Sequence, residues 1–463
     1  MDHNEFSALP LRSDLIKSVS SLGYCKMTPI QTKALPYILK GLDVIGEGTT
    51  GSGKTVAFSL GLLNKLDLKE FKIQALALCP TRELANQIAE EIRKLARTTY
   101  NTKVLILCGG SPFGPQKGSL GHGAHIVVGT PGRILDHLNK NNLSLKHINT
   151  FVLDEADRML DMGFQASLNA IIEELPKDRQ TLLFSATFEK SVLSISKEVM
   201  RDPKVIKVTP RDDESKINQI YYHVKDEKNR IHALKLILFK YRPKSTIIFC
   251  ETKKESVVIA DFLIDLGLSA LPIHGDLDQK DRDQTLVCFS NNSLSILVAT
   301  DVASRGIDIS LLSAVINYKL ARDINSHVHR IGRTGRMGAS GEVYNLYTEK
   351  EQYKIKLLER SFNQIILSKD LPSIDVLSNK LFKPLMKTLQ IDGGKKQKVR
   401  AGDILGALTG NGGIEADRVG DIKIKDNWSY VAVDTNFHQK ALKKLSMGRI
   451  KGKNFRIRLI DKN

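Results

Sequence analysis

The glycine-rich segment VIGEGTTGSGKTVAFSL, from Val44 to Leu60, is the feature that most constrains how this chain folds. An apolar run leads into it and a helix-compatible sequence follows, so the segment predicts a strand, a loop and a helix in that order. Gly48 to Thr55 matches G-x-x-x-x-G-K-S/T, in which backbone N–H groups and a helix N-terminus hold anionic phosphates. A chance turn is the alternative, but the flanking patterns weigh against it. The loop therefore predicts an α/β domain that binds a nucleoside triphosphate.

The residue types in this loop suit phosphate binding. Gly51 and Gly53 allow positive φ and a close approach of the backbone to the ligand. Lys54 is expected to reach the β- and γ-phosphates, and the hydroxyl of Thr55 is expected to ligate Mg²⁺. The other residues expected around the phosphates are Gly48, Thr49, Thr50 and Ser52.

The residues before the loop offer contacts for a nucleobase. Thr28 and Pro29 predict a helix start, with Thr28 as the cap and Pro29 in the first turn. Gln31 on that turn can present its amide to an adenine edge, because one amide both donates and accepts hydrogen bonds. Tyr24 can stack on the base. For residues that stand alone, a core tyrosine and a surface glutamine are the alternatives.

Short apolar runs alternate with helical patterns from Val44 to about Val208. This alternation predicts a parallel sheet with helices on both faces, in which ligands bind at the carboxyl ends of the strands. The run TFVLDEAD ends in Asp154 and Glu155 at such a position. We expect Asp154 to position Mg²⁺, and Glu155 to orient or deprotonate the attacking water. Stabilisation of a helix N-terminus is the alternative role for these carboxylates.

The same alternation returns after a polar, charged segment at residues 209–218, which is predicted to be a linker. Residues 219–360 therefore predict a second parallel α/β domain, and this one has no phosphate loop. Its segment HRIGRTGR carries Arg330, Arg333 and Arg336. Arginines spaced by three among glycines suit the capture of a phosphate charge. An RNA-facing basic loop is the alternative, and one motif can serve both roles.

The C-terminal part of the chain predicts a separate basic module. Residues 361–395 are expected to form a flexible linker, which runs into the basic stretch DGGKKQK at residues 392–398. Residues 396–463 predict a small α+β unit, in which KVRAGDILGALTG forms a strand and then a helix. Residues 383–463 hold 18 Lys and Arg against 8 Asp and Glu, whereas the whole chain holds 69 against 51. This concentration of positive charge favours a nucleic-acid partner, with a solvated basic face as the alternative.

The cysteines and the N-terminus bear on the cellular compartment. Five cysteines are scattered without a C-x-x-C pair, so they predict free thiols in a reducing environment and not metal ligands. The first residues, MDHNEFSALP, lack the basic and apolar regions of a secretory signal. No run reaches the roughly 20 apolar residues that span a bilayer. We therefore expect a cytoplasmic protein without a membrane partner.

The phosphate loop, DEAD, SAT and HRIGRTGR together resemble the DEAD-box family of ATP-dependent RNA helicases. The resemblance covers about residues 1–360 and implies two tandem RecA-like domains, of which the first, residues 1–208, binds ATP and Mg²⁺. It implies that Phe6, Tyr24 and Gln31, the last residue of TPIQ, form a Q motif that contributes to ATP binding. It also implies RNA contacts by Pro80, Thr81, Arg82, Gly110, Thr130, Pro131, Gly132, Arg133, Gln279, Arg282 and Thr300.

The resemblance also implies a mechanism. The two domains are open when empty and close when ATP and RNA bind, which brings Arg333 and Arg336 to the γ-phosphate and Asp308 near the nucleotide. A bent RNA strand no longer fits a duplex, so a short duplex is opened locally. Hydrolysis then releases the RNA, and Ser185 and Thr187 link the two events.

The chain departs from the family pattern at four positions. The family usually has Ala where Gly48 stands, which loosens the turn without harm. It has an acidic residue and Pro where Lys319 and Ala321 stand, and Tyr where His327 stands. These last departures lie beside HRIGRTGR and leave Arg333 and Arg336 in place.

The C-terminal unit is similar to the RNA-binding domain of DbpA-type helicases, which are known in bacteria, and the resemblance implies an RRM-like fold. It implies binding to a hairpin of large-subunit (23S) ribosomal RNA and a pre-ribosomal (50S) partner, with no DNA. An RRM usually places aromatic residues on its central strands, but KVRAGD has none. Base stacking on the sheet is therefore not expected here, and RNA binding is expected from Arg400, Lys451, Lys453, Arg456 and Arg458, with plain surface charge as the alternative.

Three functions are consistent with these motifs. The first is a helicase that remodels structured RNA during large-subunit assembly. The second is an ATP-gated RNA clamp that seldom unwinds, because clamping uses the same residues. The third is a general RNA chaperone in cold adaptation or RNA decay, in which the C-terminal unit is a loose basic anchor.

Overall fold

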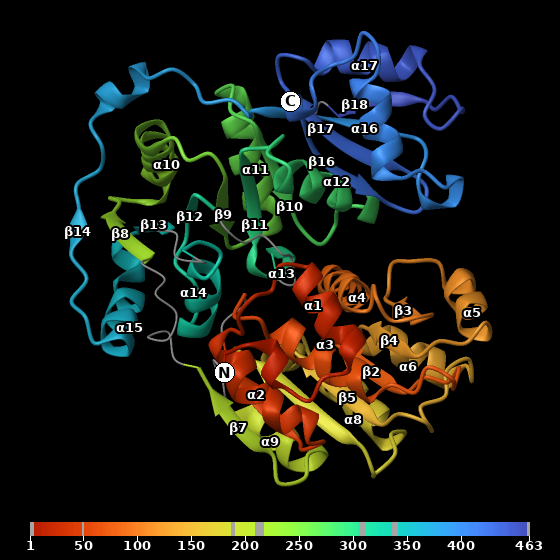
Figure 1. Cartoon of the computed structure of the whole chain (residues 1–463). Coiled ribbons are helices and arrows are strands. Elements are labelled where there is room, and N and C mark those ends of the chain that lie inside the picture. Colours follow the sequence, from red (N-terminus) through yellow and green to blue (C-terminus); the bar gives the residue numbers. More distant parts are fainter. Residues whose placement is uncertain are drawn as a thin grey trace. The chain divides into compact units, whose positions relative to one another are not determined.

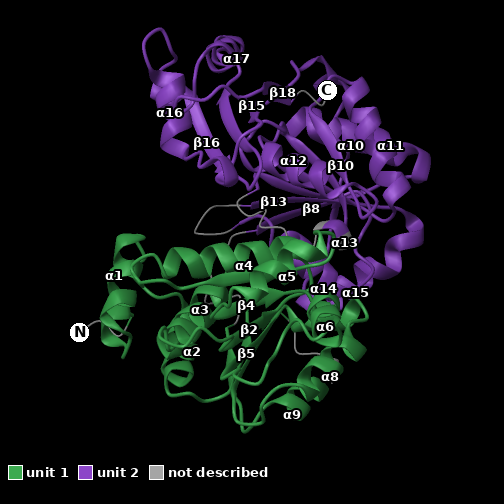
Figure 2. Ribbon diagram, turned by 90° about the vertical axis from the view of Figure 1, so that its right-hand side faces the viewer, with its two compact units in different colours: residues 1–214, 305–308 green, residues 215–304, 309–463 purple. Residues whose placement is uncertain are grey.

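The structure is a computed structural model, which describes residues 4–48, 51–186, 190–208, 217–304, 312–335 and 341–460. The chain divides into two compact units, residues 1–214 with 305–308 and residues 215–304 with 309–463 (Figure 2). The cysteines of the described residues are free thiols, and four of the five are buried. Among the described helices, none is long and apolar enough to cross a membrane.

The first unit contains a seven-stranded parallel sheet in the order β3-β4-β2-β5-β6-β1-β7 (Figure 1). All residues of β4, β5 and β6 are buried, as expected for parallel strands that are covered on both faces. The strands are β1 (Val44–Glu47), β2 (Ala75–Leu78), β3 (Val104–Leu107), β4 (Ile126–Gly129), β5 (Thr150–Asp154), β6 (Gln180–Ser185) and β7 (Lys204–Lys207).

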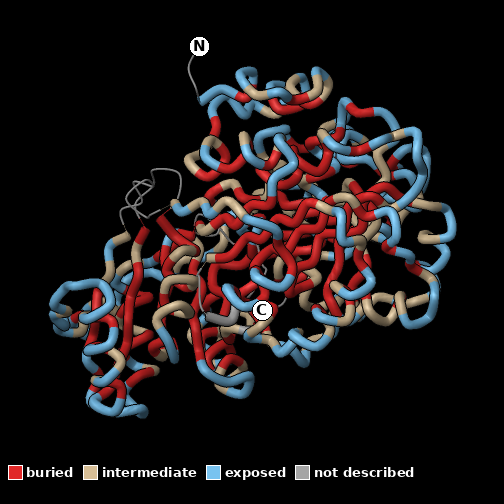
Figure 3. Tube along the Cα trace, turned by 90° about the horizontal axis from the view of Figure 1, so that it is seen from below, coloured by how far each residue is buried: buried red, intermediate tan, exposed pale blue. Residues whose placement is uncertain are grey.

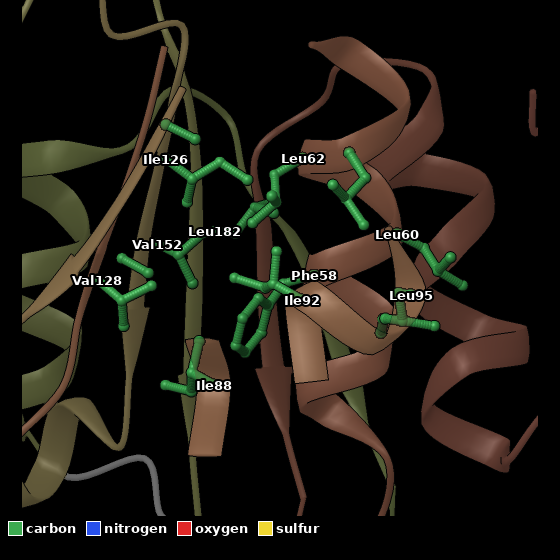
Figure 4. Close-up of a cluster of buried hydrophobic side chains, with 14 of the residues drawn as sticks. Phe58, Leu60, Leu62, Ile88, Ile92, Leu95, Ile126, Val128, Val152 and Leu182 are labelled. Carbon is green, nitrogen blue, oxygen red and sulfur yellow. The ribbon is translucent and has the colours of Figure 1, made fainter. Parts of the chain in front are cut away.

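Helices pack on both faces of this sheet, and the buried chain trace follows the strands (Figure 3). Phe58 of α3 and Ile88 and Ile92 of α4 meet Val128 and Val152 of the sheet in one hydrophobic cluster (Figure 4). The helices are η1 (Phe6–Ala8), α1 (Ser13–Ser21), α2 (Pro29–Leu39), α3 (Lys54–Lys65), α4 (Arg82–Leu95), α5 (Phe113–Gly121), α6 (Pro131–Asn139), α7 (Ala156–Asp161), α8 (Gln165–Glu173) and α9 (Lys190–Val199).

The second unit begins with another seven-stranded parallel sheet, in the order β10-β11-β9-β12-β13-β8-β14. Its strands are β8 (Ile217–His223), β9 (Thr246–Cys250), β10 (Ala270–Ile273), β11 (Ile296–Thr300), β12 (Ala314–Asn317), β13 (Gly341–Tyr347) and β14 (Ser368–Lys369). Its helices are α10 (Glu227–Tyr241), α11 (Lys253–Asp265), α12 (Gln279–Ser290), α13 (Asp301–Ser304), α14 (Ile324–Ile331), η3 (Glu349–Glu351), α15 (Gln352–Phe362) and η4 (Ile374–Ser378).

The C-terminal module, residues 386–460, is a four-stranded antiparallel sheet in the order β16-β17-β15-β18 with two helices. The predicted fold class, two tandem parallel-sheet domains followed by a small α+β domain, is confirmed. The elements are β15 (Met386–Ile391), η5 (Lys395–Gln397), α16 (Ala401–Thr409), η6 (Ala416–Arg418), β16 (Val419–Ile424), β17 (Ser429–Asp434), α17 (His438–Met447) and β18 (Ile457–Ile460).

The start of this module differs from the sequence prediction. The first strand is β15, which lies inside the segment 361–395 that was predicted to be a linker. The predicted strand around Val399 is wrong, because Val399 leads directly into α16. β15 is central in the sheet because it pairs with both β17 and β18, and the sequence gives no local sign of those distant partners. The expected linker at 209–218 lies mostly outside the described residues.

One face of the module's sheet packs against α12 of the same unit. Gln284 of α12 donates a hydrogen bond to Gln390 of β15 at 2.7 Å, and Asn291 donates one to the Thr388 hydroxyl at 2.8 Å. Tyr430 of β17 is 1% exposed. The alternate residues of β15, Leu389 among them, enter the module's own core. The sheet face that carries Thr388, Gln390 and Tyr430 is thus already in use within the chain.

Candidate active site and RNA-binding surfaces

The phosphate loop lies between β1 and α3, as the sequence predicts. The Gly48 N–H donates to the Ser185 carbonyl at 3.1 Å, which ties the loop to the end of β6. Lys54 is 6% exposed, and its Nζ donates to the Gly48 carbonyl at 2.7 Å. A carbonyl does not neutralise an ammonium, and the pKa of Asp154, whose charge also acts on Lys54, is itself raised to about 7, so this buried charge favours an anionic ligand. Thr49 and Thr50 lie outside the described residues.

The glycines of the loop are required by its geometry. Gly51 and Gly53 have φ of 88° and 94°, in the region that favours glycine. A Cβ on Gly53 would lie 2.5 Å from Gln31 Nε2. A Cβ on Gly48 would lie 3.0 Å from Ser52 Oγ, so the alanine that is usual in the family requires only a small shift of Ser52.

The residues of the helix start TPIQ hold the phosphate loop. Gln31 is 4% exposed, its Oε1 accepts from the Thr28 N–H at 2.9 Å, and its Nε2 donates to the Gly53 carbonyl at 3.1 Å. The Thr28 hydroxyl donates to the Ser52 carbonyl at 2.7 Å. The predicted helix start at Thr28 and Pro29 is confirmed. The sequence predicts an adenine contact for Gln31. The structure adds its contact with the Gly53 carbonyl of the phosphate loop, which local sequence does not indicate because Gly53 lies 22 residues away.

The two aromatic residues of the predicted Q motif differ in placement. Tyr24 is 36% exposed, and its hydroxyl donates to Glu91 of α4 at 2.8 Å. Burial and then Glu91 raise the pKa of Tyr24 to about 12, so the hydroxyl stays protonated. Phe6 is 4% exposed and belongs to the same hydrophobic cluster as Phe58. Tyr24 is therefore available for stacking, whereas Phe6 packs in the core.

Acidic side chains gather where β5 ends. Asp154 and Glu155 are 3% and 5% exposed, and the Glu155 N–H donates to Asp154 Oδ1 at 3.0 Å. Burial raises the pKa of Asp154 to about 7, an effect that Lys54 opposes and Glu155 reinforces. Glu155 has φ of 53° and ψ of 50°, a left-handed conformation that is uncommon outside glycine. Arg158, which the sequence analysis did not single out, places its Nε 3.6 Å from Glu155 Oε2.

The donor set suits a magnesium ion that is held mainly by substrate. Within the described ranges there is no group of three or more His, Cys, Asp or Glu residues that could hold a metal ion by itself. Mg²⁺ in phosphate-loop proteins takes one or two protein oxygens and completes its shell with phosphates and water. Asp154 at the end of β5 and Thr55 in the first turn of α3 supply that number.

Three segments of the first unit come together where RNA contacts are predicted. Arg82 donates to the Ser111 hydroxyl at 3.1 Å, and Arg133 donates to the Ser111 carbonyl at 3.0 Å and to Gln116 at 2.9 Å. Gly110 has φ of 69° and lies against Arg82. The structure therefore assembles PTREL, the glycine pair and TPGR around Ser111 and Gln116, neither of which the sequence analysis named. The remaining predicted residues of this group lie at two helix starts. Pro80 and Thr81 lead into α4, and Thr130 leads into α6, which begins with Pro131 and Gly132.

The second unit joins two of its predicted RNA-contacting motifs. Gln279 and Arg282 lie in the first turn of α12, and Arg282 donates to the Ala303 carbonyl at 2.8 Å. Thr300 ends β11, and its hydroxyl accepts from the Ala303 N–H at 3.4 Å. Arg282 and Thr300 thus meet at the same turn.

The arginines of HRIGRTGR are deeply placed. Arg330 is 4% exposed and makes two hydrogen bonds to Asp301, at 2.7 and 2.8 Å, so it stabilises the domain itself. Arg333 is 3% exposed. Arg336, Asp308 and Thr187 lie outside the described residues, whereas Ser185 is buried at the end of β6.

The departures beside this motif are accommodated by local chemistry. Lys319 lies 3.5–3.6 Å from Glu227, Glu251 and Glu255. Burial works against its charge, but the three carboxylates outweigh burial and raise the pKa of Lys319. His327 is 1% exposed, lies 3.0 Å from Gln219, and has its pKa lowered to about 3 by burial and by Arg330. A neutral histidine therefore fills this buried position, and Ala321 is buried as well.

Most of the predicted basic residues of the C-terminal module lie on two connected loops, whereas Arg458 lies in β18. Lys451 Nζ donates to the Lys398 carbonyl at 3.2 Å, which joins the loop after β15 to the loop before β18. The joined loops form a basic cluster, whose exposed members are Lys395, Lys396, Lys398, Arg400, Lys451, Lys453 and Arg456. The first three were not singled out from the sequence: Lys395 ended the predicted linker, and Lys396 and Lys398 fell at the start of the predicted α+β unit. Arg458 pairs with Asp392 at 2.5 Å.

These features define a class: a phosphate-loop nucleotide-binding protein built on two tandem parallel α/β domains, with a basic C-terminal module. Family models match in the same order. The DEAD/DEAH box helicase model matches residues 28–195, the helicase conserved C-terminal domain matches residues 227–338, and the DbpA RNA binding domain matches residues 388–459.

Curated relatives and solved structures agree with these matches. The chain is 49% identical to the ATP-dependent RNA helicase DbpA of Escherichia coli (strain K12), over 96% of this chain and 97% of the relative. It is 37% identical to the DbpA of Bacillus subtilis (strain 168), over 99% and 100%. The structure resembles S. cerevisiae Dbp5 bound to RNA and ADP BeF3, with 31% identity, a TM-score of 0.72 and coverage of 80% and 96%.

The chain belongs to the DEAD-box family of ATP-dependent RNA helicases and is of the DbpA type. It is therefore an RNA-dependent ATPase and helicase that uses ATP and binds RNA, as the motifs predicted. The two parallel-sheet domains are RecA-like domains of the kind found in this family.

Proposed function

We propose that the chain uses ATP to remodel structured 23S ribosomal RNA during assembly of the 50S subunit. The observation that carries this proposal is the basic cluster on the C-terminal module. Seven exposed cations lie on two loops of that module, which the bond from Lys451 to the Lys398 carbonyl joins. The module also matches the DbpA RNA binding domain. A helicase with such an attached module can be targeted to one RNA.

The nucleotide is proposed to bind first to residues of the first domain. Tyr24 stacks on the adenine, and Gln31 contacts its edge while holding the Gly53 carbonyl. The backbone from Gly48 to Thr55 surrounds the phosphates, and Lys54 moves from the Gly48 carbonyl to the β- and γ-phosphates. Asp154, mostly through water, and Thr55 hold Mg²⁺, which supplies charge neutralisation on the phosphates.

Hydrolysis is proposed to depend on Glu155. Its carboxylate lies beside Asp154 at the end of β5, where it can orient a water and take its proton. Arg333 and Arg336 of the second domain stabilise the charge that develops on the γ-phosphate, and Asp308 lies near the nucleotide. Ser185 couples the site to RNA binding together with Thr187, and its carbonyl already bonds to Gly48.

RNA is proposed to bind through its sugar-phosphate backbone. Arg82 and Arg133 of the first domain and Arg282 of the second carry guanidinium groups in the first turns of α4, α6 and α12. Contacts to phosphates are largely blind to sequence, whereas the 2′-OH distinguishes RNA from DNA. Sequence preference therefore comes from the C-terminal module, and the protein acts in the cytoplasm, where ribosomes assemble.

Point substitutions test this targeting better than deletion does, because removing the module would uncover the face of α12 that holds Gln390 and Thr388. We would replace Lys398, Lys451 and Lys453 with Gln and measure ATPase stimulation by a 23S rRNA hairpin fragment and by an unrelated RNA. Stimulation by the rRNA fragment should fall by about 10-fold or more at fixed salt, while stimulation by the unrelated RNA stays low. A matched variant with Lys440, Lys443 and Lys444 of α17 replaced by Gln loses the same charge from another element of the module and should keep the preference.

A second function, a general RNA chaperone or an ATP-gated clamp in cold adaptation or RNA decay, predicts a different result. In that case the intact protein would be stimulated equally by the rRNA fragment and by unrelated RNA. Equal stimulation would contradict the targeting proposal while leaving the ATPase assignment intact.

A further inference from the structure

Arg158 places a buried guanidinium group beside the proposed catalytic carboxylate. The side chains of Arg158 and Glu155 are 5% and 6% exposed, and Arg158 Nε lies 3.6 Å from Glu155 Oε2. Isolated charges are rarely buried this deeply, because each would lose its hydration without compensation. The two charges therefore depend on each other.

The backbone fixes the relative position of the two residues. Glu155 precedes α7 in a left-handed conformation, and its carbonyl accepts from the N–H groups of Arg158 and Met159, both at 3.1 Å. Residues three apart on a helical turn face the same side, so the side chain of Arg158 is directed back toward Glu155. The pairing follows from the local fold and does not require a ligand.

Arg158 differs from the other cation of this site because the local turn, and not a loop carbonyl, holds it beside Glu155. Asp154, Glu155 and Asp157 bury three carboxylates within four positions, and Lys54 is the other deeply buried cation near them. In the proposed mechanism Lys54 turns to the phosphates. The carboxylate of Glu155 is then still neutralised by the guanidinium of Arg158, because both residues belong to the same short turn.

The two carboxylate oxygens of Glu155 are not equivalent. Oε2 is enclosed, and within the described chain neither Oε2 nor Arg158 Nε has a hydrogen-bond partner. Their separation is too long for a hydrogen bond, so the contact is an ion pair that orients the carboxylate without occupying Oε1. Oε1 takes no part in this ion pair.

We propose that Arg158 is a positioning residue for hydrolysis: it holds Oε2 of Glu155 so that Oε1 faces the attacking water. The inference rests on the proposed role of Glu155. It assigns to Arg158 an effect on the chemical step and none on nucleotide binding.

The test compares Arg158→Met with Arg158→Lys in RNA-stimulated ATP hydrolysis by the full-length protein. Loss of the charge in Arg158→Met should lower kcat by about 10-fold or more and leave the KM for ATP within about twofold. Arg158→Lys keeps a cation and should recover most of the lost kcat. An unchanged kcat in folded Arg158→Met, or a lysine variant as impaired as the methionine variant, would overturn the proposal.

Arg179→Met is the matched control, because it removes another arginine of the same unit. Arg179 donates to the carbonyls of Pro176 and Val199 and does not touch the acidic residues. It should lower thermal stability without lowering kcat below the melting range. A similar fall in kcat in both variants would assign the Arg158 effect to general stability.

A double variant separates this inference from the proposed function. Glu155→Gln should abolish turnover. Adding Arg158→Met to that variant should have no further effect on kcat, because Arg158 acts through the carboxylate that Glu155→Gln has already removed. Retained turnover in Glu155→Gln would remove the proposed role of Glu155 itself. Lost turnover in Glu155→Gln together with normal kcat in Arg158→Met would contradict only the positioning role.

Discussion

The two parallel sheets of this protein have the same strand order, but the loop after the first strand differs: it forms a phosphate loop in the first domain and a helix cap in the second. Renumbered from their own first strands, both sheets run 3-4-2-5-6-1-7. In the first domain, β1 leads into a glycine-rich loop and then Lys54 at the start of α3. In the second, β8 leads into Asp226, whose side chain caps α10 by accepting from the Asn229 N–H. The acidic cap takes the place where the first domain has its phosphate cradle.

A buried cation near the first helix shows the difference most clearly. Lys54 donates to the carbonyl of Gly48. Arg230 of α10 is fully buried and is neutralised by Glu227 and Glu351, at 2.9 and 2.6 Å, with further bonds to two carbonyls. Its pKa is raised, because these partners outweigh burial. One topology thus supports a site that is ready for an anion, or a closed ion network that stabilises the domain.

Removing the cation of the first domain should break its function. Lys54→Ala should lower RNA-stimulated ATP turnover by at least about 10²–10³-fold, because a charge aimed at the transferred phosphate is lost. Steady-state ATPase assays measure this effect. Lys65→Ala, at the far end of α3, is the control and should stay near normal turnover. Substantial activity in Lys54→Ala would place the reaction elsewhere.

Removing the cation of the second domain should instead affect stability. Arg230→Met leaves Glu351 buried beside an apolar side chain and should cost about 3–5 kcal/mol in the free energy of unfolding. Urea unfolding of the full-length protein measures the loss, and nucleotide affinity should stay unchanged. A loss of stability well below that range would mean that the network is not closed, and a loss of nucleotide affinity would contradict the comparison.

The two domains should also respond to pH in opposite directions. Burial raises the pKa of Asp154 to about 7, so the folded first domain binds a proton that the unfolded chain has released between about pH 4 and 7. Its stability should therefore fall as pH rises through this window, by at most about 1.4 kcal/mol per unit. Burial lowers the pKa of His327 to about 3, so the unfolded chain binds the additional proton from about pH 3 to 6.5, and stability rises with pH there.

Variant differences in urea unfolding, measured at several pH values, separate these opposite slopes. Asp154→Asn should remove the fall with rising pH, and His327→Phe should remove the rise. If the difference in unfolding free energy between wild type and variant changed with pH in the same direction for both substitutions, either Asp154 would not be buried in its protonated form or His327 would not be buried in its neutral form.

The smallest expected effect concerns the helix that holds the C-terminal module in the second domain. α12 of the second domain holds the C-terminal module, whereas its counterpart α5 in the first domain buries only Gln116. Thr388→Val leaves the buried amide of Asn291 without its acceptor and should weaken docking by about 1–3 kcal/mol. Trp428, the single tryptophan of the chain, lies over Lys280 of α12 and reports docking by its emission. Thr409→Val on α16 is the control, and an equal emission change in both variants would exclude a docking effect.

The sequence predicted what is encoded in contiguous segments. The phosphate loop, DEAD at the end of a buried run, and the alternation of strands and helices all follow from local pattern. β15 was missed because MKTLQI lies among basic and polar residues and becomes a strand only by pairing with β17 and β18. The loop contact of Gln31 and the three glutamates around Lys319 were missed for the same reason, since their partners lie far away in sequence.

One nucleotide site, built on Lys54 in the first domain, drives the enzyme in the proposed mechanism. Calorimetric titration of the full-length protein with ADP and Mg²⁺ counts the nucleotides that each chain binds. We expect one bound nucleotide per chain, lost in Lys54→Ala and retained in Arg230→Met. Two nucleotides per chain, or one that persists unchanged in Lys54→Ala, would contradict that mechanism.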